Sequence, residues 1–138
     1  MTTVEIRTLS GSSLAVGASG VRTITIDRAK EAGGLGLGFN AGELLLLAIG
    51  GCYSNDIFRE AGKRNISVKS VQVTVRAEWA GDPVRAQEVS FDVSVEADAS
   101  EEEILELIRH TDRVAEIPNS LRLGTEVKLQ QSKAIASR

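Results

Sequence analysis

The sequence is poor in the residues that most often bind metals. Its 138 residues include one cysteine, Cys52, and one histidine, His110. A single cysteine cannot form an internal disulfide, and one cysteine with one histidine cannot supply a zinc or iron–sulfur site within one chain. We therefore expect no metal and no bound cofactor. Any redox chemistry must use a single thiol.

The chain also lacks an excess of charge of one sign. Its 16 basic and 19 acidic residues are intermixed and give a net charge of −3, so there is no basic patch for nucleic acid or for an anionic membrane. Residues 1–7 lack the basic start and apolar run of a signal peptide. The main apolar run, about ten residues, is far below the roughly 20 that cross a bilayer. We expect a cytoplasmic protein that binds neither nucleic acid nor membrane.

Residues 40–65 form the segment around which the chain is organised. No charged side chain occurs between Leu44 and Tyr53, and apolar or small residues occupy every helical face, which is typical of a helix enclosed by protein. Asn40 is placed to cap this helix, and Glu43 is placed as its capping-box partner. The pattern predicts a central helix over residues 40–65.

Cys52 lies where the apolar run gives way to polar residues. On helical spacing, residues 48 and 49 lie one turn before it, and residues 55 and 56 lie one turn after it. The thiol is therefore expected at the edge between buried and polar surroundings, where a reactive thiol is useful. Glu43 could face a pocket near the thiol, but about 13 Å of straight helix separates the two residues.

The flanking segments predict an α+β fold with antiparallel sheets in one domain, residues 1–138. Period-two patterns indicate a strand meander in residues 1–30 and a long hairpin with one wet face in residues 66–97. An amphipathic second helix is expected over residues 100–115, and Pro118 is expected to break the helical pattern. Val127 and Leu129 indicate a last strand over residues 121–130. One chain offers little material to enclose the central helix, so we expect an obligate homodimer.

Two further features have plain structural interpretations. Gly36-x-Gly38-x-x-Ala41 superficially resembles a dinucleotide fingerprint, but no strand runs directly into it and no second crossover unit follows. A flexible glycine loop is the favoured interpretation. His110 lies near the polar boundary of the second helix, where a solvated or locally bonded histidine is favoured over a general base because no Ser or Cys is nearby in sequence.

Two motifs carry a resemblance to a known family. Residues 40–52, Asn-Ala-Gly-Glu-Leu-Leu-Leu-Leu-Ala-Ile-Gly-Gly-Cys, resemble the Asn-Pro-Glu-Glu-Leu-Leu-Ala-Ala-Ala-Leu-Ala-Gly-Cys motif of the osmotically inducible protein C and organic hydroperoxide resistance (OsmC/Ohr) superfamily. Residues 115–121, Ala-Glu-Ile-Pro-Asn-Ser-Leu, resemble its Cys-Pro-Val-Ser-Asn-Ser-Leu motif, and residues 65–68 resemble the segment before its long hairpin. The resemblance covers nearly the whole chain and implies an OsmC-like intertwined homodimer with two active sites at the interface.

The resemblance also implies roles for single residues. In active members the helix cysteine attacks an organic hydroperoxide, a second cysteine resolves the sulfenic acid, and lipoyl or other thiols reduce the disulfide. Cys52 occupies the attacking position. The resolving position is Ala115, the thiolate-supporting glutamate falls on Gly42 with Glu43 displaced by one residue, and the first-turn arginine has no counterpart in residues 11–13. The chain resembles a divergent one-cysteine member.

Two hypotheses for function remain open. In the first, Cys52 is the peroxidatic thiol of an organic hydroperoxide reductase, and an external thiol resolves its sulfenic acid. Burial alone raises a thiol pKa, so this hypothesis needs a supporting group, for which Arg7 or Arg22 could approach. In the second, the chain is a catalytically degenerate dimer that binds a small apolar or acidic ligand or has a stress-related role. Cys52 is then a small buried hydrophobe.

Overall fold

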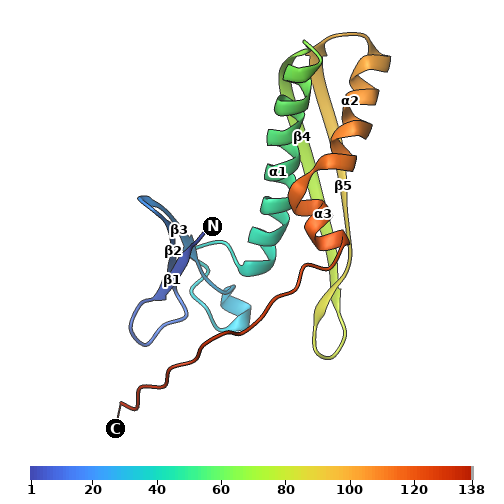
Figure 1. The fold of residues 1–138 in the computed structure, drawn as a ribbon. Helices are drawn as coiled ribbons and strands as arrows, with labels where there is room; N and C mark the ends of the chain where they lie inside the picture. Colours follow the sequence, from blue (N-terminus) through green and yellow to red (C-terminus); the bar gives the residue numbers. More distant parts are fainter. Residues whose placement is uncertain (138) are drawn as a thin grey trace.

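The computed structural model describes residues 1–137, and Figure 1 shows its helices and strands. In chain order these are β1 (Glu5–Thr8), β2 (Ala15–Ser19), β3 (Arg22–Ile26), the short 3₁₀ helix η1 (Lys30–Ala32), α1 (Ala41–Lys63), β4 (Ser67–Ala80), β5 (Arg85–Asp98), α2 (Glu101–Val114) and α3 (Glu116–Arg122). Both sheets are antiparallel. The α+β class predicted from the sequence is confirmed.

The N-terminal strands form a three-stranded meander in the order β1-β2-β3, and the glycine-rich loop that follows is built around Asp27. This buried carboxylate accepts hydrogen bonds from the amides of Arg28, Leu35 and Leu37. A Cβ at Gly34 would lie 2.1 Å from the Arg28 carbonyl oxygen, so this close turn requires glycine. The loop amides thus bind the protein's own carboxylate, which argues against a phosphate cradle.

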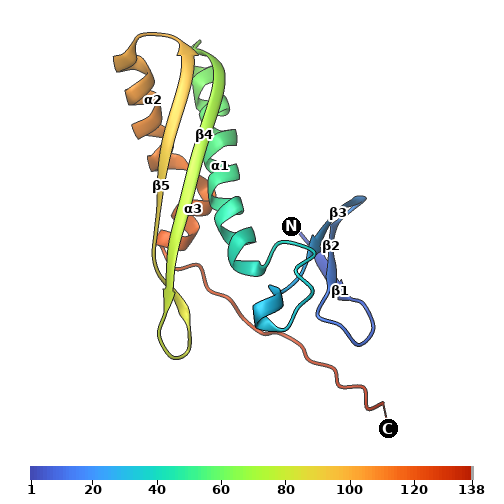
Figure 2. The same cartoon turned by 180° about the vertical axis from the view of Figure 1, so that it is seen from behind.

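The long hairpin provides the surface on which α1 and α2 pack, and α3 packs against these two helices. β4 and β5 pair over nearly their whole length, with irregularities between Val68 and Ser70 and between Glu78 and Trp79. Side chains on one face are partly buried and those on the other are exposed, as the period-two pattern predicts. Figures 1 and 2 show α1, α2 and α3 on a single face of this hairpin. Gly50 allows close packing, since a Cβ there would lie 3.1 Å from a Val75 methyl.

The core lies at the C-terminal half of α1. Its fully or almost fully buried residues are Tyr53, Ile57, Ala61, Leu107 and Ala115. The Tyr53 hydroxyl donates a hydrogen bond to the Ile108 carbonyl of α2 (2.7 Å), and its ring centroid lies 5.1 Å from that of Phe91 on β5. These contacts fasten α1, α2 and the hairpin together.

The N-terminal half of α1 is covered on one side only. Leu47 is 52% exposed, and Ala48 and Gly51 are also exposed. Within one chain the hairpin and the other helices cover the opposite side, so the expected enclosure of this helix is not completed by one chain. Among residues 1–137, no helix is both long enough and apolar enough to span a membrane.

The predicted last strand over residues 121–130 is wrong. α3 extends to Arg122, and residues 125–137 have no regular secondary structure. Pro118 does not end a helix here because it is the third residue of α3, in the first turn, where its missing N–H is not needed. The apolar residues that suggested a strand, Val127 and Leu129, are exposed. Within residues 1–137 they pair with no strand, and pairing is what makes an extended segment a strand.

Candidate active site

The thiol of Cys52 forms hydrogen bonds with residues of two helices, α1 and α3. The residue is partly buried in the middle of α1. Its Sγ donates a hydrogen bond to Asp56 Oδ2 at 3.6 Å, one helical turn further on, and accepts one from the Ile117 amide at 3.4 Å. Ile117 lies at the start of α3. The two sequence motifs that carry the family resemblance therefore meet at the sulfur, although 65 residues separate them.

Behind the thiol lies an ion-paired cluster centred on Arg59. Its guanidinium contacts Asp56 (Nη1 to Oδ1, 3.3 Å), Glu60 (Nε to Oε2, 2.9 Å) and Glu116. Asp56 is 6% exposed and Glu60 is 4% exposed. Such burial of carboxylates is tolerated because each is paired and hydrogen-bonded. Cys52, Asp56 and Arg59 stand at helical positions i, i+4 and i+7, a one-face spacing that the sequence interpretation did not use.

Glu60 extends this cluster to α2. It accepts hydrogen bonds from Lys63 (3.1 Å) and contacts His110 Nε2 at 2.7 Å. His110 is thus bonded, but to a residue of α1 that is distant in sequence rather than to a local partner. Hydrogen bonds from Arg59, His110 and Lys63, in that order, lower the pKa of Glu60 to about 2. The cluster therefore holds an ionised carboxylate inside the protein.

The surroundings of the Cys52 thiol favour its protonated form. Burial is the main cause that raises the pKa of Cys52, and the nearby Asp56 charge raises it further, while the Ile117 amide opposes them in part. Arg59 gives little help to a thiolate because three carboxylates already compete for its charge. A reaction at Cys52 therefore needs a way to remove the proton.

The predicted site residue Glu43 serves a structural purpose in this chain. Its amide donates to Asn40 Oδ1 (2.8 Å), and its carboxylate accepts from the Asn40 amide (3.0 Å), so the predicted capping box is confirmed. The hydrogen bonds of Cys52 go to Asp56 and Ile117 instead, and the structure does not bring Glu43 to the thiol. A catalytic role for Glu43 stays a prediction.

The structure shows the surroundings of two positions where the family pattern is altered, Gly42 and Ala115, and of the two arginines that could replace the missing one. At Gly42, a Cβ would lie 3.1 Å from Trp79 Cζ2, so the indole occupies the space beside the missing glutamate. Ala115, at the resolving position, is fully buried between α2 and α3. Arg7 and Arg22 lie on β1 and β3, and neither hydrogen-bonds to Cys52 within the chain.

Three potential metal ligands also gather at the thiol. Cys52 Sγ and carboxylate oxygens of Asp56 and Glu116 lie within 4.8 Å of one another. Arg59 already bridges the two carboxylates, and a cation placed among them would compete with its guanidinium. We therefore assign this cluster to ion pairing rather than to metal binding.

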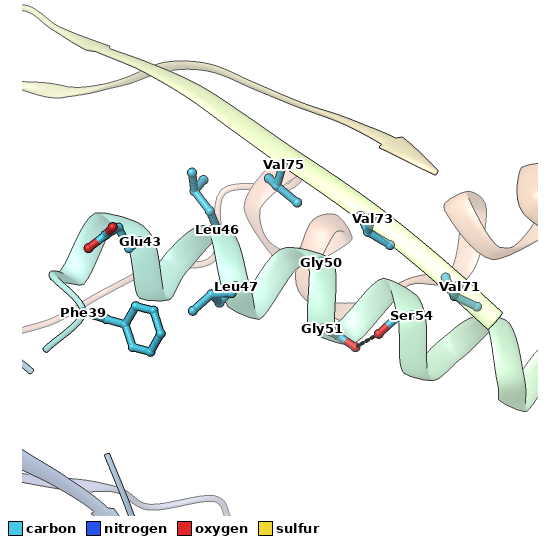
Figure 3. Close-up of a pocket in the computed structure, with 10 residues that line it drawn as sticks. All are labelled: Phe39, Glu43, Leu46, Leu47, Gly50, Gly51, Ser54, Val71, Val73 and Val75. Carbon is cyan, nitrogen blue, oxygen red and sulfur yellow. Dashed lines mark hydrogen bonds between the residues drawn. The ribbon is translucent and has the colours of Figure 1, made fainter. Parts of the chain in front are cut away.

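An apolar cavity of about 440 Å³ lies along the uncovered side of α1. Its lining is mostly apolar and comes from the N-terminal half of α1, the preceding loop and β4: Phe39, Glu43, Leu46, Leu47, Gly50, Gly51, Ser54, Val71, Val73 and Val75. Figure 3 shows Glu43 and Phe39 at one end and Gly51 and Ser54, hydrogen-bonded to each other, towards the other. Cys52 adjoins this second end through its neighbour Gly51 but is not itself part of the lining.

The sequence model of the OsmC-like protein family matches residues 33–130. The chain belongs to this family. Its structure is similar to that of an OsmC-like protein of Mycoplasma pneumoniae, with TM-score 0.77 and 20% identity over 91% of this chain and 89% of that one. The organic hydroperoxide resistance protein OsmC of Legionella pneumophila gives TM-score 0.62 and 19% identity over 88% and 89% of the two chains.

A third similar structure is the organic hydroperoxide resistance protein OhrB of Bacillus subtilis. It gives TM-score 0.64 and 18% identity over 91% of this chain and 92% of that one. At such identities these likenesses show the fold. No curated protein matches the OsmC-like chain in sequence.

Proposed function

We propose that this OsmC-like protein reduces organic hydroperoxides at Cys52 and that an external thiol restores the enzyme. The observation that carries the proposal is the hydrogen bond from the Ile117 amide to Cys52 Sγ. It places an N–H donor against the sulfur, where it can stabilise the negative charge that develops during attack. The names of the Legionella pneumophila and Bacillus subtilis relatives, both organic hydroperoxide resistance proteins, support the substrate class.

The proposed reaction uses one protein thiol. The sulfur of Cys52 attacks the terminal oxygen of the hydroperoxide, the O–O bond breaks, and an alcohol leaves with the thiol proton. The resulting sulfenic acid condenses with an external thiol to give a mixed disulfide and water. A second external thiol then releases Cys52 by thiol–disulfide exchange. The resolving step is intermolecular because the chain has one cysteine and Ala115 stands at the resolving position.

We further propose that two copies of the single domain, residues 1–138, assemble as a homodimer. The uncovered side of α1, with Leu47 half-exposed, supports this assembly. An apolar helix face of this kind is stabilised when a second copy removes it from water. In the dimer, Arg7 or Arg22 of either copy could approach the thiol.

Consumption of cumene hydroperoxide in the presence of dithiothreitol tests the activity. We expect turnover by the wild type and none above background by Cys52→Ser, because serine is not a redox nucleophile. Thr74→Ala, on the exposed face of the hairpin, is the matched control and should keep the wild-type rate. Circular dichroism should show all three proteins folded. Equal consumption by wild type and Cys52→Ser would refute the proposal.

The second candidate function is ligand binding without catalysis. The specific observation in its favour is the apolar cavity of about 440 Å³ together with the raised pKa of Cys52. Titration with 1-anilinonaphthalene-8-sulfonate, which is both apolar and acidic, tests this function. Saturable binding that is lost in Ser54→Phe, combined with an inert thiol, would favour it over the peroxidase.

A further inference from the structure

We propose that Asp56 is a catalytic residue: it accepts the proton of the Cys52 thiol as the sulfur attacks and passes that proton to the departing alkoxide. The inference rests on the proposed hydroperoxide reductase function for its electrophile. Neither motif that carries the family resemblance includes Asp56, which lies four residues beyond the cysteine.

The two oxygens of the Asp56 carboxylate have different partners. Oδ2 accepts the hydrogen bond from Cys52 Sγ at 3.6 Å, and Oδ1 lies 3.3 Å from Arg59 Nη1. The ion pair with Arg59 therefore leaves the oxygen that faces the thiol free to take a proton. Because Asp56 is 6% exposed, bulk water competes weakly for that oxygen. The helix fixes the spacing, since residues i and i+4 lie on the same face.

Proton transfer from Cys52 to Asp56 leaves the total charge of the two side chains unchanged, which matters in a buried site. A thiolate formed by losing its proton to water would add a second negative charge beside Asp56, which is unfavourable in a low dielectric. Transfer to Asp56 keeps one negative charge on the pair and moves it by one hydrogen bond. Arg59 stays beside the pair throughout, and the Ile117 amide donates to the sulfur where the charge arrives.

The other charged groups around the pair are fixed by their own partners. Glu60 and Lys63 of α1 contact each other, Glu116 of α3 contacts Arg59, and His110 of α2 contacts Glu60. Among these described contacts, Asp56 is the carboxylate that hydrogen-bonds to Cys52. It is therefore the group placed to receive the proton.

The proposed step balances. The S–H bond breaks as the S–O bond forms, and the proton moves to Asp56 Oδ2 while the O–O bond of the hydroperoxide breaks. The alkoxide then takes the proton from Asp56 and leaves as the alcohol. Sulfur is oxidised to the sulfenic acid, the peroxide is reduced, and Asp56 returns to its carboxylate form.

Asp56→Asn distinguishes a base from a fixed negative charge, because the two roles predict opposite changes in the reaction rate. As a fixed charge, Asp56 disfavours the thiolate, so removing it would speed a reaction that depends on the thiolate. As a base, its removal should slow the reaction on the order of 100-fold near neutral pH. The test measures the second-order rate constant with cumene hydroperoxide from about pH 6 to pH 9, around the range in which thiols begin to ionise.

We expect a shallow pH profile for the wild type and a profile for Asp56→Asn that rises about tenfold per pH unit, following the thiolate fraction. Asp56→Glu keeps a carboxylate and should recover part of the rate. Glu106→Gln is the matched control, because it removes a carboxylate of α2 that pairs with Arg109 and Arg113 rather than with Arg59 or the thiol. Its rate should stay within about threefold of the wild type, since it leaves the base in place.

Alkylation of Cys52 by iodoacetamide over the same pH range tests the base role without a hydroperoxide. If the wild type fails to reduce hydroperoxide but Asp56→Asn still slows alkylation, the proposed function fails and the base role stands. An Asp56→Asn rate equal to or above the wild-type rate with both reagents would overturn the inference. The pH dependence of the wild-type rate constant tests the inference without any variant. A wild-type rate constant that rises tenfold per pH unit would also overturn the base role of Asp56.

Discussion

The two halves of α1 differ in which side chains the chain removes from water. In the N-terminal half, apolar side chains line an open cavity, and Leu47 is exposed. In the C-terminal half, the carboxylates of Asp56 and Glu60 are buried. The difference lies in the partners each half has within one chain. Arg59, Lys63 and His110 pair with the buried carboxylates, whereas the described residues 1–137 leave the apolar side around Leu47 open to water.

Hydropathy alone identifies a helix segment that must be removed from water, but it does not identify the residues that pack against that segment. The two halves also suit different roles. Cys52, at the middle of α1, together with Asp56 and the ion-paired cluster of the C-terminal half supplies a thiol, a hydrogen-bonded carboxylate and fixed charges, an arrangement suited to chemistry at the sulfur. The N-terminal half offers an apolar surface suited to a second copy and to a substrate's apolar part.

The largest effect is expected from Leu47→Asp, in the uncovered half. In the proposed dimer the aspartate would be buried without a partner, at a cost above about 4 kcal/mol of association free energy. Sedimentation velocity should show folded monomers at concentrations where the wild type is a dimer. Thr74→Asp, on the exposed hairpin face, should leave the dimer intact. A dimeric Leu47→Asp protein with wild-type affinity would contradict the assigned interface.

Arg59→Met should destabilise the other half. The change leaves the Asp56 and Glu60 carboxylates buried with fewer counter-charges, and we expect a loss of about 3 kcal/mol in the free energy of unfolding. Urea unfolding at fixed protein concentration measures it. Arg76→Met breaks the exposed pair with Asp92 and should change stability by less than about 1 kcal/mol. Equal losses in the two variants would show that burial of the Arg59 cluster has no special effect.

Tyr53→Phe should have a moderate effect and a distinct pH dependence. Loss of the hydrogen bond to the Ile108 carbonyl should lower the free energy of unfolding by about 1 kcal/mol. Burial, assisted by the Asp112 charge, raises the pKa of Tyr53 to about 12 from 10.0. The folded state thus holds this proton more tightly. The associated stability is present below pH 10 and is lost as the pH rises towards 12.

The pH-dependent part of the Tyr53 effect can be isolated with the phenylalanine variant. Chemical unfolding at a series of alkaline pH values should show a steeper decline for the wild type than for Tyr53→Phe. Parallel declines would mean that other groups control alkaline stability.

The smallest effect is expected from Glu43→Ala. Loss of the capping box with Asn40 should lower the free energy of unfolding by about 0.5 kcal/mol. Because Glu43 and Cys52 lie about 13 Å apart along the helix, the hydroperoxide rate constant should stay within about twofold. A large fall in the hydroperoxide rate constant without loss of the dimer would place Glu43 at the active site. The N-terminal half of α1 would then take part in catalysis as well.

The sequence predicts local features well. The central helix, expected over residues 40–65, is observed over Ala41–Lys63 with the expected cap, and the long hairpin and the second helix are also found. Each depends on periodicity or on contacts within a few residues. The position of Cys52 at a polar boundary is correct for the same reason.

Features that depend on distant partners could not be predicted. Burial of Glu60 depends in part on His110, 50 residues away, and the Ile117 amide reaches Cys52 across 65 residues. Neither spacing leaves a periodic signal. α3 was missed because Pro118 was interpreted as a helix breaker, although it is tolerated in a first turn. Residues 121–130 have the alternation of a strand, but alternation does not supply a pairing partner.

The most direct test of the central claim is a single-turnover oxidation of Cys52 followed by intact mass spectrometry. The wild type is mixed with one equivalent of cumene hydroperoxide without reductant, and a dimedone trap is then added. We predict one dimedone adduct per chain, formed with one equivalent of alcohol, and no adduct in Cys52→Ser. An unmodified wild-type chain beside intact hydroperoxide would contradict the claim and leave the apolar cavity as the functional feature of the molecule.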